Sequence, residues 1–330
     1  VMLMLLDTPA FAYAFFGTIK IGAVAVPVNT LLKPADYRYL IEDSRASVLI
    51  ISSALLPAVE ALPREQLHRL RHVIVVGEPP PQGCLAFDDV IGAAADRLDA
   101  EPTTRDDVAF WLYSSGSTGV RKACVHLQHD MVVCAELFAK GVLGMTAADR
   151  TFSVAKLFFA YGLGNALYFP FAVGATTILH PGPPTAARVY EIIEGHRPTI
   201  LYSVPTGYGM LLAETRTPDF DLTSIRLAVS AGEALPAALF GRFRERFGLD
   251  ILDGIGSTEA LHMFIANRPG EIRPGSSGRL VAGYDARILD EQDHEVADDE
   301  IGNLWIRGDS VCAGYWNQHV KSTQTIQGAW

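Results

Sequence analysis

The chain has 330 residues, of which 49% are hydrophobic and 19% are charged, and its formal net charge is −10. This much apolar material can fill the core of one large domain or of two ordinary ones. No run of like charges stands out, so the sequence indicates neither a nucleic acid nor an anionic membrane surface as a partner. The negative balance does not exclude an anionic substrate, because local groups determine what a site binds.

Four widely spaced cysteines bear on the cellular location. Cys84, Cys124, Cys134 and Cys312 form no C-x-x-C pair, and such isolated cysteines are typical of reduced thiols in a cytoplasmic protein. No basic segment precedes the apolar run near the start, as one does in a secretory signal. We therefore expect a cytoplasmic protein.

An apolar segment over residues 10–28 has the composition of a membrane span but is interrupted. A span needs about 20 predominantly apolar residues, whereas here Lys20 and Gly22 break the run and Pro27 ends it. The segment instead predicts a buried helix over residues 9–21, a turn at Gly22 and a strand over residues 23–28.

Apolar β-branched runs alternate with helical patterns along most of the chain. In order, the predicted strands cover residues 1–7, 23–28, 47–52, 72–77, 108–114, 151–155, 175–179, 199–204, 226–231 and 250–255. The predicted helices cover residues 9–21, 34–43, 128–142, 161–173, 186–196, 206–214 and 236–247. Several strands are apolar throughout, as strands buried on both faces are. The alternation predicts an α/β fold of mostly parallel sheets covered by helices.

The texture of the sequence changes after residue 270. Gly and Pro cluster there, and two short strands follow over residues 285–290 and 302–307, with a charged turn between them. This predicts a small, mainly antiparallel β section at the C-terminal end. Both chain ends lack a polar tail, so we expect a fragment of a longer protein.

A Ser/Gly-rich loop is the sharpest feature of the sequence. Five of the six residues from Ser114 to Gly119 are Gly or Ser, and Lys122 follows. The loop comes after a predicted strand and before a helix expected to begin near His126, and its free N–H groups and hydroxyls can wrap a polyphosphate. The spacing matches neither a Walker A loop nor a dinucleotide fingerprint. A flexible surface loop is the alternative interpretation.

Two further polar turns follow predicted strands. One reads DGIGSTE over residues 253–259, where Thr258 offers a hydroxyl to phosphate and Glu259 offers a hard oxygen ligand to Mg²⁺. The other reads SAGEALP over residues 230–236. Each alone could be an ordinary turn, but turns at the carboxyl ends of strands in open α/β sheets are where ligands bind.

These three motifs, in this order and at these separations, resemble the adenylate-forming (AMP-binding) superfamily. The longer strings FWLYSSGSTG, VHLQHDM, KLFFAYGLGNAL and DGIGSTEALHMF are similar to benzoate–CoA ligases. The resemblance covers essentially the whole chain and implies the large domain of such an enzyme. In that domain, residues 1–270 are a nucleotide- and acid-binding α/β region, residues 271–330 are a small β-rich subdomain, and the C-terminal lid domain is absent.

The resemblance also implies three sets of site residues. The β- and γ-phosphates of ATP lie against Ser114, Ser115, Gly116, Ser117, Thr118, Gly119 and Lys122. The rest of the nucleotide lies against Gly232, Glu233, Ala234, Asp253, Gly254, Ile255, Gly256 and Ser257, with Thr258 at the α-phosphate and Glu259 on Mg²⁺. The aromatic acid lies among Phe159, Ala160, Tyr161, Gly162, Tyr202 and His262. Lys122, Thr258 and Glu259 are the expected catalytic residues.

The implied reaction is AMP-forming ligation of a benzoate-like acid to coenzyme A, as in aromatic compound degradation. ATP activates the acid to an acyl-adenylate, and coenzyme A then displaces AMP, with Mg²⁺ assisting. The sequence leaves open another aryl or acyl acid, a nucleotide-binding module without turnover, and a homo-oligomer. Because the lid domain is expected to be missing, we expect the isolated fragment to turn over poorly.

Two departures from the family pattern lie beside the phosphate loop. Relatives have Pro-Lys-Gly where this chain has Arg121-Lys122-Ala123. Arg121 is expected to add charge near the phosphates. A left-handed residue with a Cβ costs about 1–2 kcal/mol, so a requirement for positive φ at Ala123 predicts that Ala123→Gly improves affinity or stability. His126 and His129 are expected at the start of the following helix.

Overall fold

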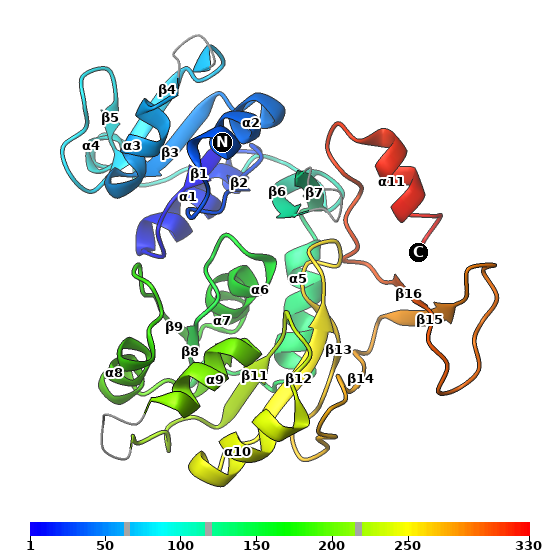
Figure 1. Ribbon diagram of the computed structural model, residues 1–330. Coiled ribbons are helices and arrows are strands. Elements are labelled where there is room, and N and C mark those ends of the chain that lie inside the picture. Colours follow the sequence, from blue (N-terminus) through cyan, green and yellow to red (C-terminus); the bar gives the residue numbers. More distant parts are fainter. Residues whose placement is uncertain (63–66, 116–120, 215–219) are drawn as a thin grey trace.

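The structure of the protein is a computed structural model that describes residues 1–62, 67–115, 121–214 and 220–330. The N-terminal part is a five-stranded parallel sheet in the order β2-β1-β3-β4-β5. Its strands are β1 (Met2–Met4), β2 (Val26–Pro27), β3 (Val48–Ser52), β4 (His72–Val76) and β5 (Leu85–Ala86). The accompanying helices are α1 (Pro9–Lys20), α2 (Pro34–Ser44), η1 (Ser53–Leu55), α3 (Leu56–Glu60) and α4 (Phe87–Gly92). This group forms the blue and cyan lobe of Figure 1.

A second sheet of seven strands, in the order β14-β13-β12-β11-β10-β8-β9, forms the other lobe. Its parallel strands are β8 (Arg150–Ser153), β9 (Thr176–Ile178), β10 (Ile200–Ser203), β11 (Leu227–Ser230) and β12 (Ile251–Gly256). Two strands, β13 (Met263–Ala266) and β14 (Arg279–Leu280), continue it in antiparallel fashion. Its helices α8 (Ala186–His196), α9 (Pro205–Ala213) and α10 (Ala237–Phe247) bury apolar faces in a core with β10 and β11. The two sheets and their helices confirm the expected α/β fold.

The helical segments at the junction of the two lobes contain π-helical turns. The helix predicted over residues 128–142 consists of α5 (Asp130–Cys134) and the π-helical η3 (Ala135–Lys140). The helix predicted over residues 161–173 consists of α6 (Ala160–Leu163), the π-helical η4 (Gly164–Tyr168) and α7 (Phe169–Val173). Single π turns inside helices are frequent at functional sites, and Gly164 of η4 lies against the ring of His262.

The phosphate-loop motif lies on a hairpin, which corrects the expected strand-to-helix turn. Strands β6 (Val108–Ser115) and β7 (Arg121–Leu127) pair antiparallel, so His126 is a strand residue and the helix begins only at Asp130. Residues 121–127 form a strand because β7 is hydrogen-bonded along both edges. One edge pairs with β6, and on the other the N–H groups of Ala313 and Trp316 donate to the carbonyls of Val125 and Ala123. That partner lies nearly 200 positions away, where local sequence carries no signal.

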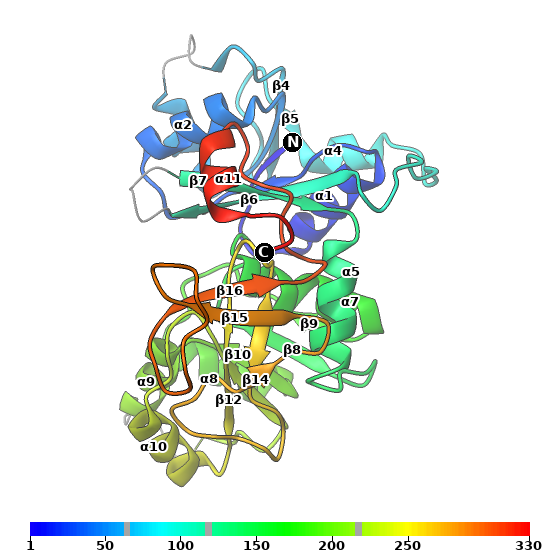
Figure 2. The same cartoon turned by 90° about the vertical axis from the view of Figure 1, so that its right-hand side faces the viewer.

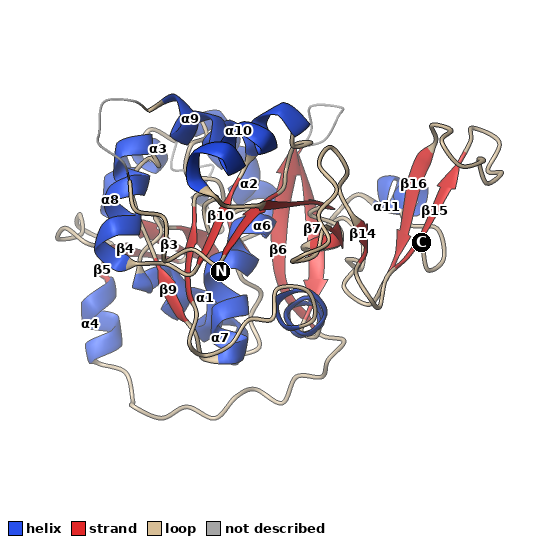
Figure 3. Cartoon of the chain, turned by 90° about the horizontal axis from the view of Figure 1, so that it is seen from below, coloured by secondary structure: helices blue, strands red, loops and turns tan. Residues whose placement is uncertain are grey.

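The C-terminal segment adds a separate two-stranded antiparallel sheet of β15 (Asp285–Leu289) and β16 (Asn303–Arg307), as the sequence predicts. It projects from the main body (Figure 3), while α11 (His319–Thr325) lies beside β6 and β7 (Figure 2), where Gln318 just before it donates to the Arg121 carbonyl. Strand β14 belongs to the seven-stranded sheet, and a boundary near residue 270 stays a prediction.

The apolar N-terminal segment is a core element. Phe11 and Phe15 of α1 are fully buried, and the ring of Phe15 lies 5.5 Å from that of Phe110 in β6. The expected turn is present at Gly22, whose φ is +70°. Within the described parts of the chain, no helix is long and apolar enough to cross a membrane.

Candidate active site

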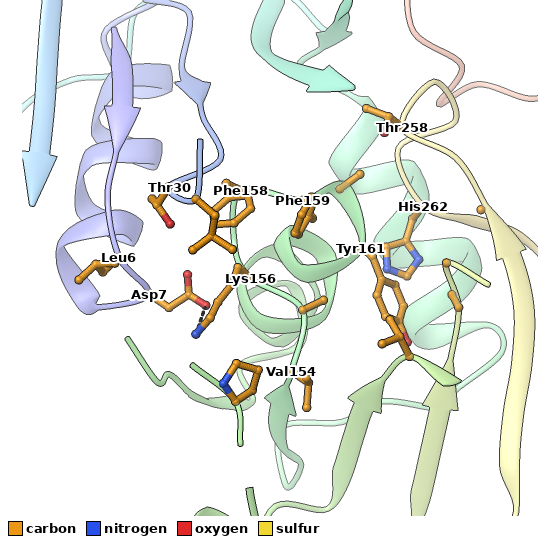
Figure 4. Close-up of a pocket in the computed structure, with 18 of the residues that line it drawn as sticks. Leu6, Asp7, Thr30, Val154, Lys156, Phe158, Phe159, Tyr161, Thr258 and His262 are labelled. Atoms are coloured by element: carbon orange, nitrogen blue, oxygen red, sulfur yellow. Dashed lines mark ion pairs between the residues drawn. The ribbon is translucent and has the colours of Figure 1, made fainter. Parts of the chain in front are cut away.

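A cavity of about 780 Å³ lies where the carboxyl ends of strands from both sheets converge. Leu6 and Asp7 follow β1, Val154 follows β8, and Gly232 follows β11. The opposite wall comes from the turn after β12, including Thr258, and from the start of α6 (Figure 4). The convergence expected for the polar turns at strand ends is therefore present for the turns after β11 and β12.

One end of the cavity has aromatic walls. The rings of Tyr161 and His262 face one another with centroids 5.5 Å apart, and Phe158 and Phe159 stand at the N-terminal end of α6 (Figure 4). The Tyr161 hydroxyl lies 3.2 Å from the Ser203 carbonyl and 3.1 Å from the Val229 carbonyl, so it can donate to either. These contacts fix the ring, and flat apolar walls suit a planar aromatic ligand.

His262 is held in a neutral state by burial. Desolvation lowers its pKa to about 3, because a buried imidazolium has lost its hydration. Its Nε2 lies 3.1 Å from Asn165 Oδ1 and donates there in the neutral tautomer. The preceding residue, Leu261, is fully buried with φ of +67°. A left-handed non-glycine residue costs about 1–2 kcal/mol, and this strained turn sets where the His262 ring points.

The turns after β11 and β12 line the cavity with backbone and hydroxyl groups. Gly232, which has φ of +91°, Gly256, Ser257 and Thr258 are exposed to it. Five predicted nucleotide contacts, Glu233, Ala234, Asp253, Gly254 and Ile255, lie outside its lining. Glu233 and Ala234 are exposed.

The remaining three of these residues belong to β12. Ile255 is 37% exposed, and Gly254 packs under Met263 so closely that a Cβ would lie 2.2 Å from its methyl group. Asp253 is buried, burial raises its pKa, and its Oδ2 accepts a 3.4 Å hydrogen bond from the Leu235 N–H. Its Oδ1 has no hydrogen-bond partner among the described residues.

Beyond Thr258 the polar groups form a compact cluster. Lys122 Nζ lies 3.6 Å from Glu259 Oε1, and the Tyr315 hydroxyl donates to the same oxygen over 2.7 Å. Burial raises the pKa of Tyr315, so its hydroxyl is a donor. Ser114 Oγ is buried with no partner in the described structure. The expected phosphate contacts Gly116, Ser117, Thr118 and Gly119 lie outside the described residues, as does the side chain of Ser115.

The donor set at Glu259 suits Mg²⁺ that arrives with a nucleotide. Across the described ranges, no group of three or more His, Cys, Asp and Glu side chains could hold a metal ion. Mg²⁺ in phosphate-transfer sites is typically held by one or two carboxylates, substrate phosphates and waters. A single carboxylate near a lysine fits that pattern and does not fit a resident metal centre.

A buried pair of side chains supports Thr258 from behind. His126 Nδ1 lies 2.8 Å from Asp130 Oδ2, and its Nε2 lies 2.8 Å from the Thr258 carbonyl. The two ring nitrogens thus tie the turn after β12 to the start of α5. The expected helix-start role of His126 is therefore wrong, whereas His129 does directly precede α5.

The other end of the cavity carries an ion pair that sequence reasoning missed. Asp7 Oδ2 lies 3.8 Å from Lys156 Nζ, which donates to the carbonyls of His180 and Gly182 over 2.6 and 2.7 Å (Figure 4). Burial raises the pKa of Asp7 to about 6 and lowers the pKa of Lys156. The sequence did contain a signal for Asp7, because it is a polar residue just beyond the carboxyl end of an apolar strand.

Two of the six predicted acid-binding residues lie outside the cavity lining. Phe159, Ala160, Tyr161 and His262 line it, whereas Gly162 and Tyr202 do not. Tyr202 is fully buried behind Tyr161, with its hydroxyl 3.5 Å from Met145 Sδ. A Cβ at Gly162 would lie 2.1 Å from the Lys156 carbonyl, so this glycine allows close helix packing.

The two departures beside the phosphate loop have structural explanations. Arg121 pairs with Asp36 of α2 at 3.3 Å, so part of its charge is already neutralised. Ala123 is buried within β7, pairs with Tyr113, and is not among the residues with positive φ. The expectation that Ala123→Gly relieves strain is therefore wrong, because an extended strand residue needs no glycine.

Comparisons with known proteins agree with this geometry. The model of the family described as AMP-binding enzyme matches residues 1–316. The chain is 44% identical to a benzoate–CoA ligase of Thauera aromatica and 43% identical to a 4-hydroxybenzoate–CoA/benzoate–CoA ligase of Rhodopseudomonas palustris. Each alignment covers 100% of this chain but only 62% and 61% of these relatives, so the chain spans less than two thirds of their length.

Solved structures give the same result. An anthranilate CoA ligase in complex with anthranoyl-AMP superposes with a TM-score of 0.97 at 46% identity, over 99% of this chain and 63% of that one. A benzoate CoA ligase from Burkholderia xenovorans superposes with a TM-score of 0.92 at 44% identity, over 100% and 65%. The chain belongs to the family of AMP-binding enzymes.

Proposed function

We propose that this chain carries the nucleotide and acid sites of a ligase that activates a benzoate-like acid with ATP and joins it to coenzyme A. The observation that carries the proposal is one continuous cavity that joins the aromatic walls at Tyr161 and His262 to Thr258. An aromatic ring bound against those walls has its carboxylate directed toward the turn expected to hold the α-phosphate. The similarity to a benzoate–CoA ligase and to a 4-hydroxybenzoate–CoA/benzoate–CoA ligase supports the same substrates.

The chemistry has two balanced steps. A carboxylate oxygen of the acid attacks the α-phosphorus of ATP and releases pyrophosphate, leaving an acyl-adenylate. The sulfur of coenzyme A then attacks the acyl carbon, its proton is lost, and AMP leaves. The first step needs in-line placement and charge neutralisation more than covalent help, and placement can contribute roughly 7–11 kcal/mol.

Individual residues have distinct proposed roles in the first step. The Thr258 hydroxyl donates to an oxygen of the α-phosphate, and Lys122 neutralises charge on the departing phosphates. Mg²⁺, held by Glu259 together with the phosphates, supplies further neutralisation. Neutral His262 forms part of the ring wall and places no cation against the ring.

Calorimetric titration with non-hydrolysable adenylate mimics tests the proposal on this chain. We expect a benzoyl-adenylate mimic to bind with a stoichiometry of one and at least about tenfold more tightly than a hexanoyl-adenylate mimic. The variant Ala160→Phe, which fills the wall of the cavity, should lose this binding but retain ATP binding. Ala213→Phe, on the exposed end of α9, is the matched control and should behave like the parent chain.

Three outcomes would contradict the proposal in different ways. Tighter binding of the hexanoyl mimic would assign the site to an alkyl acid. Binding of ATP without either mimic would indicate a nucleotide-binding module. Unchanged binding of the benzoyl mimic in Ala160→Phe would show that the cavity is not where the acid binds.

A further inference from the structure

Tyr315 stands at the centre of the polar cluster that the proposed function assigns to ATP and Mg²⁺. Its hydroxyl donates to Glu259 Oε1 over 2.7 Å and lies 3.3 Å from Lys122 Nζ, and the same Nζ lies 4.4 Å from the centre of its ring. The Tyr315 side chain therefore contacts Glu259 through its hydroxyl and Lys122 through both its hydroxyl and its ring. The phenol donates a hydrogen bond to the carboxylate, the phenol oxygen accepts one from the ammonium, and the ring face lies against the ammonium as in a cation–π contact.

The backbone holds this tyrosine in place independently of the two charged side chains. Tyr315 pairs with Cys124 of β7, and its N–H donates to Ser322 Oγ over 2.9 Å. Just before it, the Cys312 N–H donates to the Glu259 carbonyl over 2.7 Å. Tyr315 as a whole is only 5% exposed. These backbone contacts and the burial of the side chain therefore fix the position of the Tyr315 hydroxyl. Its position does not depend on where Lys122 and Glu259 lie, as that of a mobile surface side chain would.

We propose that Tyr315 is a positioning residue for the triphosphate and its divalent cation. It orients the Glu259 carboxylate by occupying Oε1, so that the other carboxylate oxygen would be left to hold the cation. It also keeps Lys122 close to the phosphate side of the site when no nucleotide is bound. This inference rests on the proposed function, and it adds a residue whose sequence position, 193 residues from Lys122, gave no local signal.

The arrangement has a specific consequence for nucleotide binding. Without ATP, Lys122 and Glu259 neutralise one another at 3.6 Å. When MgATP binds, the lysine gains the phosphates and the carboxylate gains the cation, so their mutual contact is replaced. The hydroxyl of Tyr315 remains hydrogen-bonded to the carboxylate throughout. Removing it frees the carboxylate to turn toward the lysine, which opposes cation binding.

The variant Tyr315→Phe tests this role, because it removes the hydroxyl and keeps the ring. We expect calorimetry to show MgATP binding that is about 10- to 100-fold weaker, the range expected for loss of a hydrogen bond to a charged group. Half-saturation with Mg²⁺ at fixed ATP should shift to higher concentration. A benzoyl-adenylate mimic, which lacks the pyrophosphate and its cation, should bind within about twofold of the parent affinity.

Tyr284→Phe is the matched control. Tyr284 is equally buried, and its hydroxyl is bonded to Ser310 Oγ over 2.6 Å, with no contact to the charged pair. It should leave both affinities unchanged. In the Glu259→Gln background, Tyr315→Phe should have little further effect on MgATP, because the two residues act through one contact.

Two results would overturn the inference. One is unchanged MgATP binding and unchanged Mg²⁺ dependence in Tyr315→Phe. The other is an equal loss of MgATP and mimic affinity, accompanied by a lower melting temperature, since that pattern indicates a purely structural role. Failure of the parent chain to bind the benzoyl mimic would instead count against the proposed function, so the two failures are distinguishable.

Discussion

The substitution Gly164→Ala tests whether the absence of a side chain at position 164 sets the position of the His262 ring in the acid site. Gly164 begins the π-helical segment η4, and a Cβ added there would lie 2.6 Å from His262 Cδ2 and 2.9 Å from the Tyr168 hydroxyl. Ordinary contact begins at 3.4 Å, so the imidazole must move by about 0.8 Å. Phe138 and Phe169 pack against the same ring with centroids 5.1 and 4.5 Å away. The open direction is the cavity.

Overpacking of this kind costs about 1–3 kcal/mol. Alanine in a helix gains up to about 1 kcal/mol over glycine, so we expect a net loss of roughly 1–2 kcal/mol in the free energy of unfolding. A ring displaced into the cavity should also weaken the benzoyl-adenylate mimic by at least about tenfold, as misplacement within a binding site does. Urea denaturation and calorimetric titration measure the two effects separately.

Gly209→Ala is the control for helix propensity. Gly209 lies inside α9 with nothing within 4 Å of an added Cβ, so this variant should be slightly more stable and bind the mimic as the parent does. If Gly164→Ala were as stable as Gly209→Ala and bound the mimic equally well, the argument that close packing by Gly164, Phe138 and Phe169 fixes the His262 ring would be refuted.

Three further predictions concern stability. Burial raises the pKa of Asp7 to about 6, so the native carboxyl keeps its proton above the pKa of the unfolded chain; stability should fall by about 1–3 kcal/mol as pH rises from about 4 to 6 and level off above. Asp7→Asn should flatten that slope in urea titrations, and an unchanged slope would contradict the assignment. Burial raises the pKa of Asp149, but hydrogen bonds from Arg226 and Thr199 outweigh it and hold the pKa at about 2. That contribution is present above pH 4 and is lost as pH falls toward 2. Arg226→Gln should therefore lower stability by about 1–3 kcal/mol at pH 7, since the arginine is partly exposed, and should weaken the acid dependence. Ala123→Gly should lower stability by about 0.5–1 kcal/mol, as glycine does inside a strand, and a more stable variant would restore the strain argument.

Much of the fold could be predicted from local pattern because the parallel strands are buried on both faces. Within β3 and β4, residues 48–51 and 73–76 are all Val, Leu or Ile, and such runs mark strands without reference to partners. The hairpin at the phosphate loop could not be predicted in this way. Residues 121–127 begin with Arg121 and Lys122 and include His126, and their strand state depends on pairing with β6 and with residues 313–316.

The site divides along the same line. The place of Thr258 and Glu259 could be predicted because they follow the end of a strand, where ligands bind in open α/β sheets. Asp7 obeys the same rule and was missed because the strand before it opens the chain. Lys156 and Tyr315 act through contacts with residues distant in sequence, and no local spacing reports such contacts.

A crystal structure of this chain with a benzoyl-adenylate mimic tests the central claim most directly. The account predicts the phenyl ring against the wall formed by Phe159, Tyr161 and His262, the phosphate mimic beside Thr258, and the adenine at the turn after β11 near Gly232. A ring bound in the lobe beside Asp7 and Lys156, or an adenine between the aromatic walls, would contradict the assignment of the cavity to an aromatic acid and its adenylate.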